Sequence, residues 1–171
     1  MQAGRMDIAC HSVIASLFLS HGIRPNVKFH LVLGGPPDPV KHIEIQYHPD
    51  SSISKKDIGN LIRSTLWKYK KNKKIEAFPG VFIEKKEFDD LINEFKKRNL
   101  YLLDERGVDI NTVDLKDNPV FILGDDDGLP KVEKKIAKKA AKATLRVGPL
   151  PYFTSQTIII INNYLDIKGI E

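Results

Sequence analysis

The feature that most constrains the fold is the alternation of short strand-like runs with longer helical segments. The strand-like runs are rich in Val, Ile, Phe and Tyr and are bounded by polar or turn residues: 27–33, 42–47, 81–83, 100–103, 120–123 and 144–147. The helical segments between them are 7–20, 55–71 after a Ser54 cap, 86–97 and 131–142. This alternation predicts an α/β fold with a mainly parallel sheet.

The C-terminal segment, 153–166, is compatible with two structures. The run 158–161 consists of isoleucines, and such β-branched residues favour a buried strand. Thr154 or Ser155 could instead cap a buried helix that continues through 162–165. The pattern alone leaves strand and helix equally open.

Composition sets limits on organisation and location. The chain has 171 residues, 42% of them hydrophobic, and no linker divides it, so we expect a single domain over 1–171. Cys10 is the only cysteine, which excludes an intramolecular disulfide and favours a reducing, intracellular compartment. The apolar stretch 8–19 is too short to span a bilayer and is interrupted by polar residues. We therefore expect a cytoplasmic protein without a membrane partner.

Two glycine-containing loops, 121–130 and 146–152, each follow a predicted strand and precede a predicted helix. Ligands bind at such positions in open α/β sheets. Gly124, Gly128 and Gly148 would let a ligand approach the backbone closely. Glycines at strand ends also make tight turns, and for each loop taken alone the turn is the simpler interpretation.

The charged residues raise two functional hypotheses, a metal site at three successive aspartates and RNA binding by the basic residues. Asp125, Asp126 and Asp127 could attract a divalent cation, but their spacing matches no metal motif, and acids are common at helix N-termini. We therefore predict capping and no metal. The formal net charge of +5 favours a polyanion such as RNA. For each of two lysine runs, a solvated surface is the first interpretation and contact with phosphates is the second. The runs are Lys68, Lys70, Lys71, Lys73 and Lys74, and Lys131, Lys134, Lys135, Lys138, Lys139 and Lys142.

Four segments, in this order along the chain, carry a family resemblance: 4–7 (Gly-Arg-Met-Asp), 18–24, 118–125 and 160–166. Together they resemble the archaeal tRNA (pseudouridine-N1)-methyltransferases of the SPOUT superfamily. The similarity covers nearly the whole chain, and the combination is more specific than any single motif.

The resemblance implies a SPOUT fold with a deep trefoil knot in the C-terminal half, which is an exception to the rule that chains avoid knots. It also implies a homodimer, and it favours a helix for 153–166. S-adenosylmethionine (SAM) would be the cofactor and tRNA the partner, with N1 of pseudouridine 54 in the T-loop as the methylated atom. By position, the cofactor site would comprise Leu103, Gly124, Val147, Gly148, Pro149, Leu150, Pro151, Tyr152 and Thr157.

Asp7 and Arg5 are the catalytic candidates that the resemblance implies. N1 of pseudouridine carries a weakly acidic proton, so an acceptor must remove or polarise it during methyl transfer. Asp7 would do this, with Arg5 beside it to orient a phosphate or base. Without the resemblance, Asp7 is an ordinary acid at a helix N-terminus and Arg5 a member of an exposed ion pair.

Two other functions fit the sequence. One is a related SPOUT methyltransferase that acts on rRNA or at another tRNA position. The other is a basic RNA-binding module that has lost cofactor binding. SAM titration distinguishes the module from both enzymes, and nucleoside analysis of tRNA distinguishes the two enzymes.

Overall fold

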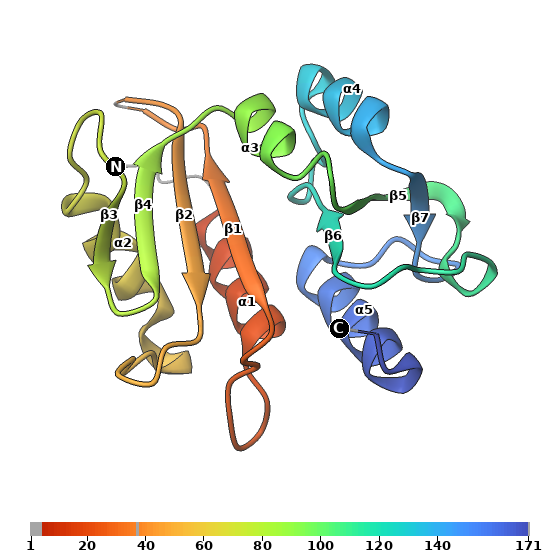
Figure 1. Cartoon of the computed structure of the whole chain (residues 1–171), viewed down its shortest axis with the longest axis horizontal. Helices are drawn as coiled ribbons and strands as arrows, with labels where there is room; N and C mark the ends of the chain where they lie inside the picture. Colours follow the sequence, from red (N-terminus) through yellow and green to blue (C-terminus); the bar gives the residue numbers. More distant parts are fainter. Residues whose placement is uncertain (1–4, 37, 171) are drawn as a thin grey trace. The chain divides into compact units, whose positions relative to one another are not determined.

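The computed structural model describes residues 5–36 and 38–170, and the chain divides into two compact units, Met1–Glu87 and Phe88–Glu171. Each unit has its own sheet and its own helices (Figure 1). The organisation of 1–171 as one domain stays a prediction.

The first unit contains an antiparallel sheet of four strands in the order β1-β2-β4-β3. Its strands are β1 (Lys28–Leu33), β2 (Lys41–Gln46), β3 (Ile75–Phe78) and β4 (Val81–Lys85). Its helices are α1 (Met6–Leu17), the 3-10 turn η1 (Lys55–Asp57) and α2 (Ile58–Trp67). The Ser54 hydroxyl accepts a hydrogen bond from Lys56 N at 3.4 Å, so Ser54 caps the 3-10 turn η1. The predicted helix over 55–71 is shorter in the structure, because α2 covers only Ile58–Trp67.

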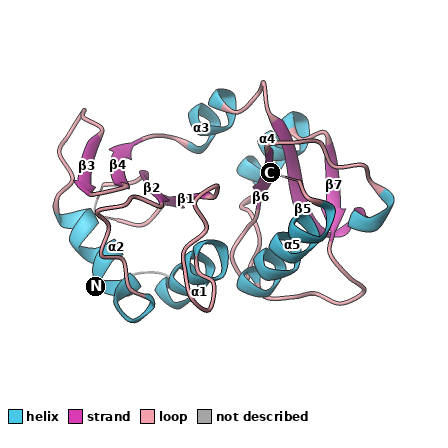
Figure 2. Cartoon of the chain, turned by 60° about the horizontal axis from the view of Figure 1, so that its bottom comes forward, coloured by secondary structure: helices cyan, strands magenta, loops and turns pink. Residues whose placement is uncertain are grey.

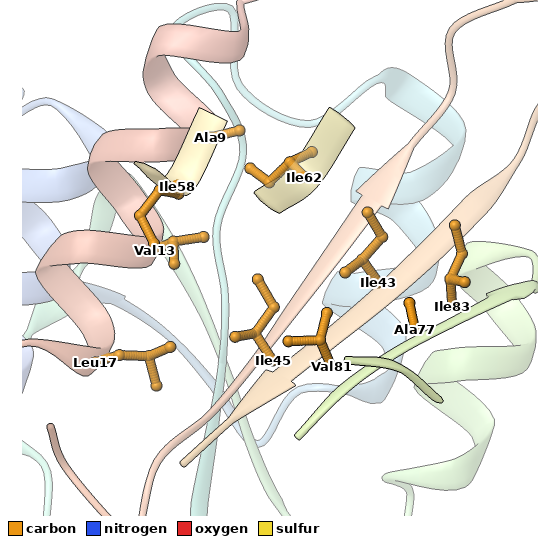
Figure 3. Packing of buried hydrophobic residues seen from close by; sticks show 10 residues of the cluster. All are labelled: Ala9, Val13, Leu17, Ile43, Ile45, Ile58, Ile62, Ala77, Val81 and Ile83. Carbon is orange, nitrogen blue, oxygen red and sulfur yellow. The ribbon is translucent and has the colours of Figure 1, made fainter. Parts of the chain in front are cut away.

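One face of this sheet is packed against α1 and α2 (Figure 3). Alternate strand residues point to the same face, so Ile43 and Ile45 on β2 lie in one buried layer with Ile83 on β4. Val13 of α1 and Ile62 of α2 are completely buried in the same cluster. The alternation of apolar and polar residues along β2 therefore determines which face of the sheet carries the helices.

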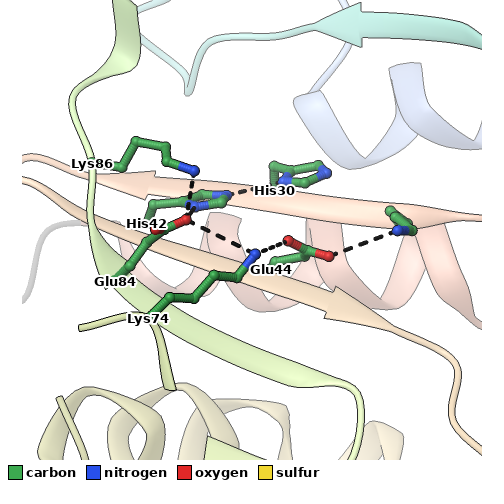
Figure 4. Close-up of polar contacts among 7 residues, drawn as sticks. His30, His42, Glu44, Lys74, Glu84 and Lys86 are labelled. Atoms are coloured by element: carbon green, nitrogen blue, oxygen red, sulfur yellow. Dashed lines mark hydrogen bonds and ion pairs between the residues drawn. The ribbon is translucent and has the colours of Figure 1, made fainter. Parts of the chain in front are cut away.

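The opposite face carries a polar cluster (Figure 4). His42 Nδ1 lies 3.1 Å from Glu84 Oε1, and His42 Nε2 lies 2.9 Å from His30 Nδ1. A carboxylate only accepts, so His42 donates through Nδ1 and accepts from His30 through Nε2. Lys86 and Lys74 surround the carboxylates, with Lys86 Nζ 2.6 Å from Glu84 Oε1.

Both histidines of this cluster are held neutral. Burial, followed by the neighbouring His42, lowers the pKa of His30 to about 4. Burial also lowers the pKa of His42, although the Glu84 carboxylate acts in the opposite direction. The pair therefore contributes hydrogen bonds and ring stacking rather than charge, with ring centroids 5.2 Å apart.

The second unit contains a parallel sheet of three strands in the order β6-β5-β7. Its strands are β5 (Asn99–Asp109), β6 (Pro119–Ile122) and β7 (Ala143–Arg146). Its helices are α3 (Phe88–Glu94), the 3-10 turn η2 (Ile110–Thr112), α4 (Lys131–Ala140) and α5 (Thr154–Lys168) (Figure 2).

Both faces of the parallel sheet are covered. Leu100 and Leu102 of β5 pack with Ile92 of α3 and Ala137 of α4 in one cluster. The intervening Tyr101 belongs to a second buried cluster with Leu145 of β7 and Ile161 of α5. Its buried members are Tyr101, Ile110, Leu115, Leu145 and Ile161. Burial on both faces explains why β5 begins as a continuous apolar run.

Most expected elements are present, with four further differences. The single, mainly parallel sheet is wrong, because an antiparallel sheet occupies the first unit. Strand β3 was not predicted, and β5 continues to Asp109 instead of ending at Leu103. The C-terminal segment is a helix, but Phe153 rather than Thr154 or Ser155 occupies its N-cap position. Across the described residues, no helix is long and apolar enough to cross a membrane.

We predict that Gly107→Ala destabilises the second unit. A Cβ at Gly107 would lie 2.5 Å from the carbonyl carbon of Leu145 in β7, where β5 and β7 shift register. Both neighbours are backbone, so the strands must separate, and the free energy of unfolding should fall by about 1–3 kcal/mol. Chemical denaturation measures this loss. Gly35→Ala is the control, since no atom lies within 4 Å of its Cβ position, and equal stability of the two variants would contradict the prediction.

Candidate cofactor site

A cavity of about 400 Å³ lies in the second unit, where the three parallel strands lead into loops. Parallel strands end at the same edge of a sheet, so the segments after β6 and β7 converge there beside the middle of β5. The volume lies within the range of small-molecule sites. The cavity is lined by 102–106, 123–129, 145–148, 150–152, Lys134, Thr154 and Thr157.

The loop after β6 is organised by its own backbone. Gly128 adopts a positive φ of 80°, and its N–H donates to the Asp125 carbonyl at 3.1 Å. Asp125 Oδ1 accepts from Asp127 N at 3.1 Å, which closes the turn. Helix α4 begins only at Lys131, so the predicted helix capping by the three acids is wrong, and Asp125 caps its own turn.

Gly124 is required by close packing within that loop. A Cβ at Gly124 would lie 2.3 Å from the carbonyl carbon of Gly128 and 2.4 Å from Leu129 N. The Gly124 carbonyl accepts a hydrogen bond from the Thr154 hydroxyl at 2.8 Å. Thr154 therefore connects the first turn of α5 to the loop after β6, which explains why it does not act as the helix cap.

The loop after β7 faces the cavity through Gly148 and Tyr152. A Cβ at Gly148 would lie 2.7 Å from Cε2 of the Tyr152 ring, so the ring covers the glycine backbone. The loop ends at α5, where the Phe153 N–H donates to the Gln156 side chain at 3.1 Å. Unlike Gly124, Gly148 is crowded by a side chain that can move, because Tyr152 is 37% exposed.

Asp104 and Lys134 are cavity residues that the sequence interpretation did not identify. The Lys134 ammonium contacts the Asp104 carboxylate, whose side chain is only 11% exposed, and the Arg106 N–H donates to Asp104 Oδ1 at 3.0 Å. The Lys134 hydrogen bond is the main reason why the pKa of Asp104 is lowered. The only available sequence signal was an acid directly after the apolar run of β5.

The structure brings together most of the residues predicted to bind the cofactor. Eight of the nine line the cavity: Leu103, Gly124, Val147, Gly148, Leu150, Pro151, Tyr152 and Thr157. Pro149 is the exception. Pro149 is exposed in the same loop. The assignment of these residues to SAM stays a prediction.

The two predicted catalytic residues lie together in the first unit. Arg5 Nε and Nη2 each contact an Asp7 carboxylate oxygen at 3.2 Å, in a fork geometry at the start of α1. Both side chains are 56% exposed. The Arg5 hydrogen bonds lower the pKa of Asp7, so the group is a carboxylate at neutral pH. Gly4 of the same motif lies outside the described residues.

The cavity suits a ligand that has a flat ring with apolar faces and a hydrogen-bonding edge, together with a polar end. Leu103, Val147 and Leu150 supply apolar surface, and Gly124, Gly128 and Gly148 line the cavity with backbone alone, which lets a ligand approach the main chain closely. The Asp104 carboxylate can accept hydrogen bonds from hydroxyl or ammonium groups. A nucleoside with a charged substituent, such as SAM, fits this combination of apolar surface, accessible backbone and a carboxylate.

These features define an α/β protein with a nucleoside-sized cavity at the loop edge of a parallel sheet. Comparison with known sequences makes the class more specific. A protein family described as "Putative SAM-dependent RNA methyltransferase" matches residues 2–170. This chain belongs to that family.

Individual relatives resemble the chain over most of their length, and each is named tRNA (pseudouridine(54)-N(1))-methyltransferase. The protein from Methanococcoides burtonii is 40% identical over 96% of this chain and 84% of its own. The protein from Pyrococcus abyssi is 34% identical over 98% and 87%, respectively. The protein from Methanopyrus kandleri is 31% identical over 97% and 81%.

The two crowded glycines yield a paired prediction. Gly148→Ala should preserve folding, because the Tyr152 ring can turn away, but should weaken SAM binding by about tenfold or more as the ring enters the cavity. Gly124→Ala should instead lower the melting temperature, because its neighbours are backbone. Calorimetric titration and thermal melting of both variants provide the measurements. Wild-type SAM affinity in Gly148→Ala would remove this loop from the site.

Proposed function

We propose that this chain is a SAM-dependent tRNA methyltransferase that modifies N1 of pseudouridine 54. The observation that carries the proposal is the identity of 40% to a relative named for this reaction, which extends over 96% of the chain. The cavity in the second unit, with its apolar walls and backbone polar groups, supports SAM as the methyl donor. The tRNA substrate and the single cysteine support a cytoplasmic location.

The experiment that tests this function is nucleoside analysis of tRNA incubated with the protein and SAM. Transcripts with pseudouridine or with uridine at the target position form the matched pair. We expect one added methyl group on N1 of the pseudouridine and none on the uridine transcript. Methylation of rRNA or of another tRNA position would support a related SPOUT methyltransferase instead, and absence of SAM binding would support an RNA-binding module.

The proposed fold is a SPOUT fold with a deep trefoil knot in the second unit. Support comes from the loop edge of the parallel sheet, where the backbone segments approach one another closely. The Thr154 hydroxyl binds the Gly124 carbonyl, so the segment after β7 passes close to the loop after β6.

In the proposed mechanism, the Arg5-paired Asp7 accepts the N1 proton of pseudouridine. Bound SAM would supply an electrophilic methyl group on a positively charged sulfur, and residues that line the cavity, such as Gly124 and Gly148, would hold it. Asp7 would accept the proton that N1 loses. Since Arg5 lowers the pKa of Asp7, the carboxylate is always available as an acceptor at neutral pH, but it is a weak base.

We predict that Asp7→Asn slows methyl transfer by roughly 10²-fold or more while SAM affinity persists. The substitution keeps the size of the side chain and removes the acceptor. Single-turnover methylation of a T-arm containing pseudouridine measures the rate, and thermal melting measures folding. Asp57→Asn is the matched control, since Asp57 is an exposed acid at the start of α2. A folded Asp7→Asn protein with the wild-type rate would refute the catalytic role.

The proposed assembly is a homodimer in which α1 and α5 contribute to the interface. On α5, Ile159 is 56% exposed and Ile167 is 75% exposed, although Ile158 and Ile161 are buried in the core. Exposed isoleucines on a helix that also packs on the core indicate a second packing surface.

We predict that Ile159→Glu yields monomers, because it places a charge in an apolar interface. Sedimentation at micromolar concentration measures the state of association. Val132→Glu on α4 is the matched control, since Val132 is also well exposed, at 68% against 56% for Ile159, and lies outside the proposed interface. A monomeric wild-type protein would contradict the proposed dimer.

A further inference from the structure

The single tryptophan of the chain lies at an exposed position that packing does not explain. Trp67 is the last residue of α2 and is 78% exposed, the largest exposed fraction among the large apolar side chains of the described residues. The rest of α2 buries its apolar residues normally, with Ile58 and Ile62 almost inaccessible. An exposed indole does not stabilise the fold and has ample area to bind a partner.

Basic residues adjoin this indole on both sides along the chain. Arg63 lies one helical turn before Trp67, on the same side of α2, and is exposed. After the helix, Lys70, Lys71 and Lys73 are exposed in a tight turn in which Asn72 has a φ of 59° and Lys73 N donates to the Lys70 carbonyl at 3.3 Å.

The lysines of this run fall into two groups. Lys68 Nζ donates to the Ala77 carbonyl at 2.6 Å, and Lys74 Nζ contacts Glu44 at 2.8 Å, so both are used within the unit. Lys70, Lys71 and Lys73 make no side-chain hydrogen bond or ion pair with any described residue. The three lysines are therefore available to an external anion.

The charge of the chain is concentrated in the unit that holds Trp67. Met1–Glu87 contains 14 Lys and Arg against 8 Asp and Glu, whereas Phe88–Glu171 contains 13 against 14. The lysines of α4 belong to the second unit, whose acids equal its basic residues in number to within one, and Lys134 contacts Asp104. The excess of positive charge therefore favours the first unit as the site for a polyanion.

We propose that Trp67, Arg63 and the turn of Lys70, Lys71 and Lys73 form a docking surface for tRNA, in which an unpaired base stacks on the indole and the lysines contact adjacent phosphates. An aromatic platform surrounded by cations is the usual way to hold unpaired RNA. The inference rests on the proposed function, because it takes tRNA as the substrate.

The lone tryptophan makes the test direct, since fluorescence excited at the long-wavelength edge of indole absorption reports Trp67 alone. We expect tRNA to quench this emission as it binds. Trp67→Ala should weaken tRNA binding about 5- to 150-fold, and Trp67→Phe, which keeps a ring, should recover part of the loss. SAM affinity should not change in either variant.

Two charge variants of equal size locate the phosphate contacts. In one, Lys70, Lys71 and Lys73 are replaced by Gln, and in the other Lys131, Lys135 and Lys139 of α4 are replaced by Gln. The slope of log affinity against log salt is negative, and its magnitude should decrease by about 2 to 3 in the first variant and remain near the wild-type value in the second. The reverse result would place tRNA on α4 and overturn the proposal.

The outcomes separate this proposal from the proposed function. If the protein methylates tRNA but Trp67 emission is unchanged and Trp67→Ala binds tRNA normally, the docking surface is wrong and the function stands. If the wild-type protein neither binds nor methylates tRNA, both are wrong. If Trp67→Ala abolishes self-association without changing tRNA affinity, the surface belongs to a second copy of the chain, which also overturns the proposal.

Discussion

The candidate site depends on the parallel pairing of β5 with both β6 and β7. Because all three strands run in the same direction, the chain must leave the sheet and return before each new pairing, and the loops that result meet at one edge. The Thr154 hydroxyl then holds α5 against the loop after β6, and Lys134 of α4 holds Asp104. The cavity is therefore held together by polar contacts between elements that lie far apart in the sequence.

Much of the second unit could be predicted from the sequence, because burial on both sheet faces produces apolar runs of a recognisable length. The first unit was harder. Its strands alternate between apolar and polar residues, as His42-Ile43-Glu44-Ile45 does, which is typical of a sheet with helices on one face only. That alternation indicates antiparallel pairing, but the helices between strands suggested a parallel sheet. Strand β3 was missed because it is only four residues long and follows the lysine run.

The candidate site was predicted largely through family resemblance, and the structure explains why local patterns were insufficient. Gly124 and Gly148 look alike in sequence, yet one is crowded by backbone and the other by the side-chain ring of Tyr152. The hydrogen bond between Thr154 and Gly124 joins residues 30 positions apart, and no local sequence pattern indicates a contact at that separation. Asp104 was overlooked because a lone acid after a strand has no distinctive spacing, and only its Lys134 partner marks it as part of the cavity.

The stacked histidines on the polar face of the first sheet have a consequence for acid tolerance. The pKa of His30 is about 4 in the folded protein and 6.5 in the unfolded chain. Between pH 4 and 6.5, its imidazole therefore binds a proton only when the protein unfolds. The unfolded chain therefore takes up more protons there, and the folded form loses stability as the pH falls from about 6.5 toward 4. Burial lowers the pKa of His42 as well, and both of these histidines lie in Met1–Glu87, so mild acid should destabilise that half before the half that contains the cavity. The two halves of this small protein would thus differ in the pH range over which they stay folded.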